Sequence, residues 1–206
     1  DKDTSHHHGL GKAFYHLLFK SNIHFILLTY FVFELGWSLY YQSLMLLLSQ
    51  DFHVTNKVIG FFASYVGLLI SFFLIYGVRL VVNRFALTTI IKPSLFVGIA
   101  VLLIGYFANS LTVQWLIAIP ISIMVAFCYS ILITMGSDKI DPKHQGLFMG
   151  IGDALLSIAF ALTAFFGSIL AIKSAVLPEL GAAILFIVAW GLFPLAKKQY
   201  HARPKS

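Results

Sequence analysis

The chain has 206 residues, of which 59% are hydrophobic and only 11% are charged, and its mean hydropathy is +0.89. A water-soluble domain of this length could not bury so much apolar surface, so the composition excludes that class and predicts that lipid surrounds most of the chain. The formal net charge is +6, which the topology described below explains without a nucleic-acid partner. The single cysteine, Cys128, excludes an intrachain disulfide.

Residues 1–22 form a polar, basic lead-in that also carries an apolar stripe of leucine and phenylalanine. This pattern predicts a cytoplasmic segment with a short interfacial helix that leads into the first membrane span. Three consecutive histidines, His6–His8, lie in the lead-in. We interpret them as a solvated tail rather than a metal site.

The first long apolar run, residues 23–49, is long enough to cross a bilayer. Glu34 lies about 11 residues, or about 16 Å of helix rise, into this run. An acid at that depth is costly, so we expect Glu34 to exchange a proton or to meet a cationic substrate. The alternative is an acid that a hydrogen bond to a neighbouring helix neutralises, without a role in transport. The residues that share its helical face are expected to line a cavity: Tyr30, Trp37, Ser38 and Tyr41.

The remaining apolar runs are about 56–78, 86–108, 111–135, 142–172 and 178–196. Because an open sheet cannot satisfy its backbone in lipid, all six runs are predicted to be transmembrane helices of one all-α domain, residues 23–196. Thr55 and Asp141 are expected to cap helices, and Pro120 is expected to kink the fourth span. Residues 197–206 are predicted to form a frayed, basic cytoplasmic tail.

Charge placement predicts the orientation of these six spans. Both termini then lie on one side of the membrane, with the second and fourth connections. That side carries 12 of the 14 lysines and arginines, and the other side carries Lys57 and Lys173. The positive-inside rule therefore places both termini in the cytoplasm, and the expected location is a bacterial inner membrane.

Small residues recur at helical spacing along two spans. The second span carries Gly60, Ser64, Gly67 and Ser71. The fifth span carries Gly146, Gly150, Ala154 and Ser157, followed by Ala161, Ala164 and Ser168. Such stripes allow helix backbones to approach closely. They are expected to pack either within this six-helix unit or against a second one.

The fifth span begins with Gln-Gly-Leu-Phe-Met-Gly at residues 145–150, which resembles the Gln-Gly-x-x-x-Gly start of the eleventh helix in the major facilitator superfamily. It is most similar to the drug:proton antiporter branch, which includes tetracycline exporters. The segment from Tyr40 to Ala63 resembles the seventh-to-eighth-helix region of that family. The residues that carry this likeness are Tyr40, Tyr41, Leu46, Leu47, Leu48, Phe52, Ile59, Gly60 and Ala63.

Two motifs depart from the family pattern. Asn83-Arg84-Phe85-Ala86 resembles the family's Asp-Arg-x-Gly loop but replaces the acid and the glycine. Phe166-Gly167 keeps only the glycine of a Gly-Pro pair that is common late in the eleventh helix. The first departure removes the acid of the loop's gating salt bridge.

The resemblance implies the C-terminal half of a twelve-helix carrier, in which the first and fourth spans line a cavity and the third and sixth face lipid. The second and fifth would meet an N-terminal half from the same gene or a separate chain. A second copy of this chain is the other expected partner. Further expected cavity residues are Ser122, Tyr129 and Ser130, and Arg84 and Asp153 are expected at the cytoplasmic gate.

The function expected from these features is a secondary active transporter that exports small amphiphilic molecules in exchange for protons. A metabolite uptake symporter and a non-transporting six-helix membrane module are the alternatives. The sequence shows neither a Gly-rich phosphate loop, nor paired metal-ligand spacing, nor an ordered Ser/His/Asp set. We therefore expect no enzyme activity, no cofactor and no bound metal.

Overall fold

The structure is a computed structural model that describes residues 23–108, 110–174 and 176–202. The expected interfacial helix and the three histidines lie outside the described residues. Every regular element in the described part of the chain is helical. The elements are α2 (His24–Gln50), α3 (Asn56–Phe72), the π-helical turn η2 (Phe73–Gly77), α4 (Val78–Val82), α5 (Leu87–Ala108), α6 (Leu111–Ser137), the 3₁₀ turn η3 (Pro142–His144), α7 (Gln145–Lys173) and α8 (Leu177–His201).

Within the described residues, six helical segments are long and apolar enough to cross a membrane, which indicates an integral membrane protein. The predicted all-α fold with six spans is confirmed at that level. Two spans extend beyond the predicted ends. The second continues through the π turn to Val82, and the sixth continues to His201. Residues 197–201 are therefore helical rather than frayed.

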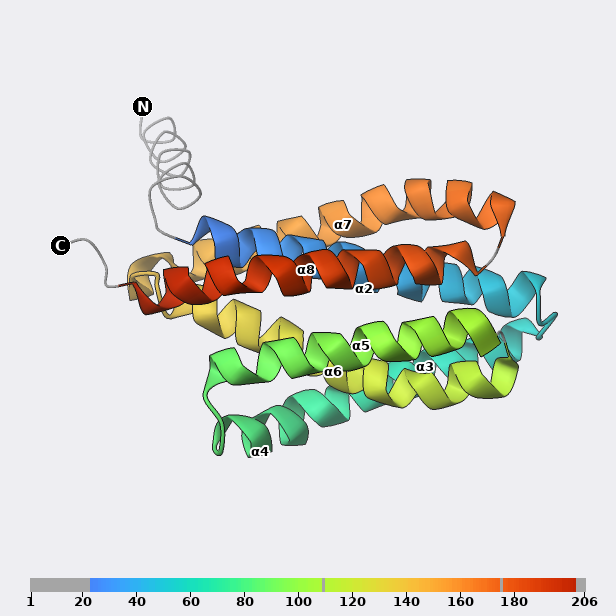
Figure 1. The fold of residues 1–206 in the computed structure, drawn as a ribbon, viewed down its shortest axis with the longest axis horizontal. Coiled ribbons are helices and arrows are strands. Elements are labelled where there is room, and N and C mark those ends of the chain that lie inside the picture. Colours follow the sequence, from blue (N-terminus) through green and yellow to red (C-terminus); the bar gives the residue numbers. More distant parts are fainter. Residues whose placement is uncertain (1–22, 109, 175, 203–206) are drawn as a thin grey trace, which may run out of the picture.

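The six spans form a bundle in which α2 is the most buried and α6 the next most buried (Figure 1). α2 packs against α8, α7 and α6, and α5 packs against both α6 and α8. The span formed by α3, η2 and α4 is the most exposed, followed by α7. The bundle therefore has two inner helices and two outer helices that leave broad apolar faces uncovered.

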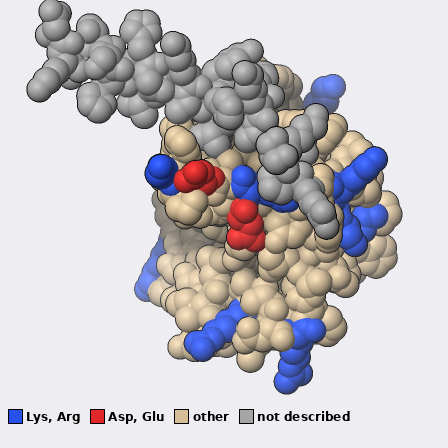
Figure 2. Space-filling view, turned by 90° about the vertical axis from the view of Figure 1, so that its left-hand side faces the viewer, with Lys and Arg blue, Asp and Glu red and all other residues tan. Residues whose placement is uncertain are grey.

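The start of α2 and the end of α8 lie at the same end of the bundle as the end of α4 and the start of α7 (Figure 1). Lysine and arginine side chains surround this end face, with fewer acidic side chains among them (Figure 2). The connection at residues 51–55, the end of α7 and the start of α8 lie at the opposite end. The bundle thus has a distinctly basic end.

The two predicted helix caps have different outcomes. The Asp141 side chain accepts a hydrogen bond of 3.0 Å from the Lys143 N–H, which confirms that cap. Thr55 is the N-cap residue of α3, as predicted, and its backbone carbonyl accepts from the Ile59 N–H at 3.1 Å, but its hydroxyl makes no cap hydrogen bond. Pro120 lies inside α6, which continues past it to Ser137.

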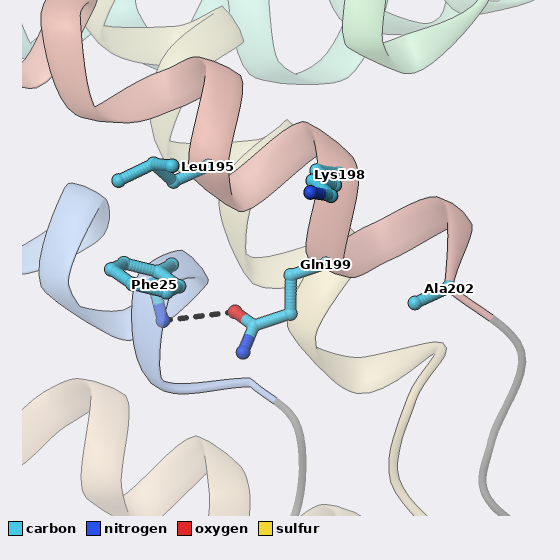
Figure 3. Close-up of a pocket in the computed structure, with 5 residues that line it drawn as sticks. All are labelled: Phe25, Leu195, Lys198, Gln199 and Ala202. Carbon is cyan, nitrogen blue, oxygen red and sulfur yellow. Dashed lines mark hydrogen bonds between the residues drawn. The ribbon is translucent and has the colours of Figure 1, made fainter.

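A side chain of α8, Gln199, joins α8 to the start of α2 at the basic end. Gln199 Oε1 on α8 accepts hydrogen bonds from the backbone N–H groups of Phe25 at 2.9 Å and Ile26 at 3.2 Å. Figure 3 shows the bond from Phe25. These N–H groups belong to the first turn of α2, where a helix offers them no backbone acceptor. A pocket of about 290 Å³ lies beside this contact, and Lys198 and Leu195 also line it.

Candidate functional site

Glu34 lies inside the bundle, near the middle of α2. Its side chain is 1% exposed, and its Oε2 is buried without a hydrogen-bond partner among the described residues. One turn earlier on the same face, the hydroxyl of Tyr30 is also buried without a partner in the described part of the chain. We expected a face turned toward water, whereas the structure surrounds both groups with protein. The two groups lie close enough to interact with each other, although no hydrogen bond of full geometry joins them among the described residues.

Two residues of α6, Cys128 and Tyr129, lie near Glu34. The ring of Tyr129 lies 6.1 Å from the ring of Tyr30, centroid to centroid, and Cys128 is fully buried. No ion pair joins Glu34 to a cation within the described segments. An uncompensated charge buried in this way costs several kcal/mol, so the neutral acid is the form that this packing accommodates. A neutral Glu34 carboxyl and the Tyr30 phenol can each donate one hydrogen bond to an entering acceptor.

The aromatic residues that follow Glu34 form a cluster on α2. The ring of Trp37 lies 5.2 Å from that of Tyr41 and 6.2 Å from that of Tyr40. Tyr41 is half-buried, whereas Trp37 is only 9% exposed. Of this cluster, Tyr41 is therefore the residue that reaches furthest toward the surface of the six-helix unit.

Ser38 joins α2 to α7. Its hydroxyl oxygen accepts a 2.9 Å hydrogen bond from Thr163, and Gln42 donates a 2.8 Å hydrogen bond to the same Thr163 oxygen. The Gln42 amide also donates to the backbone carbonyl of Phe160. Ser38 is fully buried in this network. The structure therefore places Ser38 at a helix–helix contact rather than on an open wall.

The expected cavity residues of α6 divide into two groups. The Ser122 hydroxyl is buried and donates to the Ala118 carbonyl of its own helix at 2.7 Å. Tyr129 and Ser130 are half-buried, and Tyr129 lies on the side of α6 that meets Tyr30. α6 thus contributes Tyr129, and not Ser122, to the surroundings of Glu34.

A second buried acid, which the sequence analysis missed, lies on α8. Glu179 is 1% exposed, and its Oε1 accepts a 2.7 Å hydrogen bond from the side-chain amide of Gln114 at the start of α6. Its Oε2 is buried without a partner among the described residues. The sequence does place Glu179 and Gln114 at the same side of the membrane. Each lies in the first turn of its span, and both spans begin at the non-basic end.

The position of Glu179 on its helix does not account for its burial. An acid in the first turn gains about 0.3–1 kcal/mol from the helix dipole when it is exposed and charged. Removing a carboxylate from water costs several kcal/mol, which exceeds that gain. The interaction with Gln114, rather than the helix dipole, is therefore the main local compensation.

Both small-residue stripes lie on the outer surface of the bundle. Gly60 and Gly67 on α3, and Gly146 and Gly150 on α7, have no atom within 4 Å of the position that a Cβ would occupy. The other members of the two stripes are also exposed: Ser64, Ser71, Ala154, Ser157, Ala161, Ala164 and Ser168. The expectation that the stripes pack within the six-helix unit is therefore wrong for this structure.

The two expected gate residues are both at the surface. Arg84 follows α4, and Asp153 lies on α7 two turns after its start. No ion pair joins them in the segments that the structure describes. Lys139, also at the basic end, instead donates a 2.8 Å hydrogen bond to the backbone carbonyl of Ala202.

No group of histidine, cysteine and acidic residues suited to a metal ion is present among the described residues. Comparisons with protein-family models, curated proteins and solved structures returned no match. The geometry above is therefore the basis for any functional argument. Its central feature is the Glu34 carboxyl group, which is buried at mid-span beside the Tyr30 hydroxyl and makes no ion pair within the described residues.

Proposed function

We propose that this six-helix domain is half of a secondary active transporter that couples proton movement to the export of small amphiphilic molecules. The observation that supports this most is Glu34, whose Oε2 is buried at mid-span without a hydrogen-bond partner among the described residues. A group that only stabilises the fold would be expected to have its hydrogen bonds satisfied. Intramembrane acids with open capacity are typical of proton and substrate pathways.

In the proposed cycle, two six-helix units rock about a midplane site and expose it to each side in turn. Glu34 binds a proton while it is buried and releases it when the site opens to water. Tyr30 supplies a hydrogen-bond donor, and Trp37 and Tyr41 supply aromatic surface for an amphiphilic cation. Major-facilitator membership is part of this proposal and depends on the sequence resemblance.

The exposed stripes of α3 and α7 are where the proposal places the second unit. Their glycines leave backbone open on the surface, which favours close approach of another helix. The partner is an N-terminal six-helix half or a second copy of this chain. The basic end faces the cytoplasm, so both termini are cytoplasmic, and the membrane is a bacterial inner membrane.

The Glu34→Gln variant tests the coupling role. Inside-out membrane vesicles from cells that produce the chain are energised to a fixed pH gradient, and an amphiphilic cation such as ethidium is added. Addition of the cation is expected to dissipate the gradient in wild-type vesicles. The cation-dependent proton flux should be at least about tenfold larger than in Glu34→Gln, a difference of about 1.4 kcal/mol in free energy. The glutamine keeps the shape of the side chain but cannot exchange a proton.

Asp51→Asn is the matched control, because Asp51 is an exposed acid at the end of the same helix. Its cation-dependent proton flux should equal that of the wild type. Equal flux in Glu34→Gln and wild type would remove Glu34 from the mechanism. No flux with amphiphilic cations in the wild type would contradict the export proposal itself.

A further inference from the structure

The buried pair of Glu179 and Gln114 has an incomplete hydrogen-bond pattern. Gln114 Nε2 donates to Glu179 Oε1 at 2.7 Å. The two remaining side-chain oxygens, Glu179 Oε2 and Gln114 Oε1, are both buried and have no partner in the described part of the chain. If Glu179 is ionised, both of these atoms are acceptors, and neither can satisfy the other.

One added proton removes this mismatch. A protonated Oε2 is a donor, and Gln114 Oε1 is an acceptor. A carboxylic acid and a carboxamide then each present one donor and one acceptor to the other, which allows two parallel hydrogen bonds instead of one. A proton on Oε2 would therefore complete the pair.

The packing around Oε2 supports a proton over a larger cation. A Cβ built on Gly105 of α5 would lie 2.9 Å from Glu179 Oε2 and 2.8 Å from Ile117 Cδ1, so Oε2 lies directly against the α5 backbone. From α2, the hydroxyl of Tyr40 faces this region and is itself buried without a partner among the described residues. Within those residues, no lysine, arginine or histidine pairs with Glu179. The surroundings supply little room and no compensating positive charge.

The site lies away from Glu34 and toward the non-basic end. A Cβ on Gly181, two residues after Glu179 on α8, would lie 3.0 Å from Leu39 of α2. Leu39 and Tyr40 follow Glu34 by five and six residues, which is about 8–9 Å along the helix. The two carboxyl groups therefore occupy different depths in the bundle.

We propose that Glu179 is a second proton-binding site, in which the bound proton completes an acid–amide pair with Gln114 and holds α8 to α6. Loss of the proton leaves one hydrogen bond and two buried oxygen acceptors, which weakens the contact between these helices at the non-basic end. This inference does not depend on transport by the chain, because it concerns the hydrogen bonds of the folded bundle.

Infrared spectroscopy of the full chain in lipid nanodiscs tests the proposal. At neutral pH, the wild type should show the carbonyl stretch of a protonated carboxyl group that Glu179→Gln lacks and Glu34→Gln retains. Gln114→Leu should shift this band to higher frequency, because the acid carbonyl loses its hydrogen-bond donor. A Glu34 band, if present, should not move in Gln114→Leu, so the two sites are separable.

Each alternative result counts against the proposal. Identical carboxyl bands in wild type and Glu179→Gln would show that Glu179 is ionised. A Glu179 band that does not shift in Gln114→Leu would exclude the acid–amide pair. Because glutamine offers the same donor and acceptor as the neutral acid, Glu179→Gln should keep the wild-type melting temperature. Failure of Glu179→Gln to fold would therefore also contradict the proposal.

Discussion

α2 and α7 are helices of similar length, 27 and 29 residues, and each combines small residues with one acid in its span. In α2, the backbone of Gly36 lies against α8, where a Cβ would come within 2.6 Å of the Phe186 ring. In α7, Gly146 and Gly150 have no neighbour within 4 Å of such a Cβ. Glycine therefore lies at a packed helix–helix contact in α2 and on an uncovered surface in α7.

The acids of the two helices differ in the same way. Glu34 of α2 is buried, and Asp153 of α7 is exposed. Residue type and spacing along the helix do not tell whether a glycine or an acid is buried or exposed. Burial depends on which side chains of a neighbouring helix lie opposite. The comparison between the inner and the outer helix can be tested by substitutions at equivalent positions.

Gly36→Leu should give the largest loss of stability. The leucine side chain would overlap Phe186 and Leu185, and overpacking of this kind costs about 1–3 kcal/mol. The measurement is the thermal unfolding midpoint of the purified chain in detergent. Gly146→Leu adds the same volume on the open face of α7, and it should not lower the midpoint of the six-helix unit. Similar losses in both variants would show that the α7 face is covered.

Thr163→Val should have an intermediate effect, because Thr163 is the polar residue of α7 that points inward to α2. The variant loses the hydrogen bonds to Ser38 and from Gln42. Interhelical hydrogen bonds in membranes contribute about 0.6 kcal/mol on average and up to about 1.7 kcal/mol. Equilibrium unfolding in mixed micelles measures the difference.

Ser168→Ala is the control for Thr163→Val. The exposed Ser168 hydroxyl donates only within its own helix, to the Ala164 carbonyl at 2.6 Å. Its removal should leave the unfolding free energy unchanged within error. A loss at Ser168 as large as that at Thr163 would contradict the assignment of Thr163 as the specific tie between the two helices.

Gly150→Ala should have the smallest effect, and with the opposite sign. An exposed glycine inside a helix raises the conformational entropy of the unfolded chain, so alanine should stabilise α7 by about 0.5 kcal/mol. Gly36→Ala should instead destabilise, because its Cβ meets Phe186. The two unfolding midpoints should move in opposite directions from that of the wild type; movement in the same direction would remove the distinction between the inner and outer helix.

The sequence predicted the helical bundle well, because hydrophobic length alone specifies a membrane span. The two spans that extend past their predicted ends do so through Arg79 and through Lys197 and Lys198. These side chains have long apolar stems, so they allow a helix to continue beyond the apolar run that the prediction counted. The hydropathy pattern treats such lysines and arginines as the end of a span, whereas the helices continue through them.

The candidate site was predicted less completely. Glu34 stood out because an acid at mid-span is rare, but its enclosure by α6 depends on Tyr129 and Cys128, about 95 residues away in the sequence. Glu179 resembled an ordinary first-turn acid after a proline. Its burial depends on Gln114 at the start of another helix, and helical periodicity contains no information about such a pair.

The hydrogen bonds that Gln199 accepts from Phe25 and Ile26 have a consequence for biosynthesis. A ribosome releases α2 before α8, so the opening turn of α2 lacks its acceptor until α8 has been synthesised. The opening turn of α2 therefore enters the bilayer well before its hydrogen bonds to α8 can form. The hydrogen bonds between Gln199 of α8 and the first turn of α2 can therefore form only late in the assembly of this bundle.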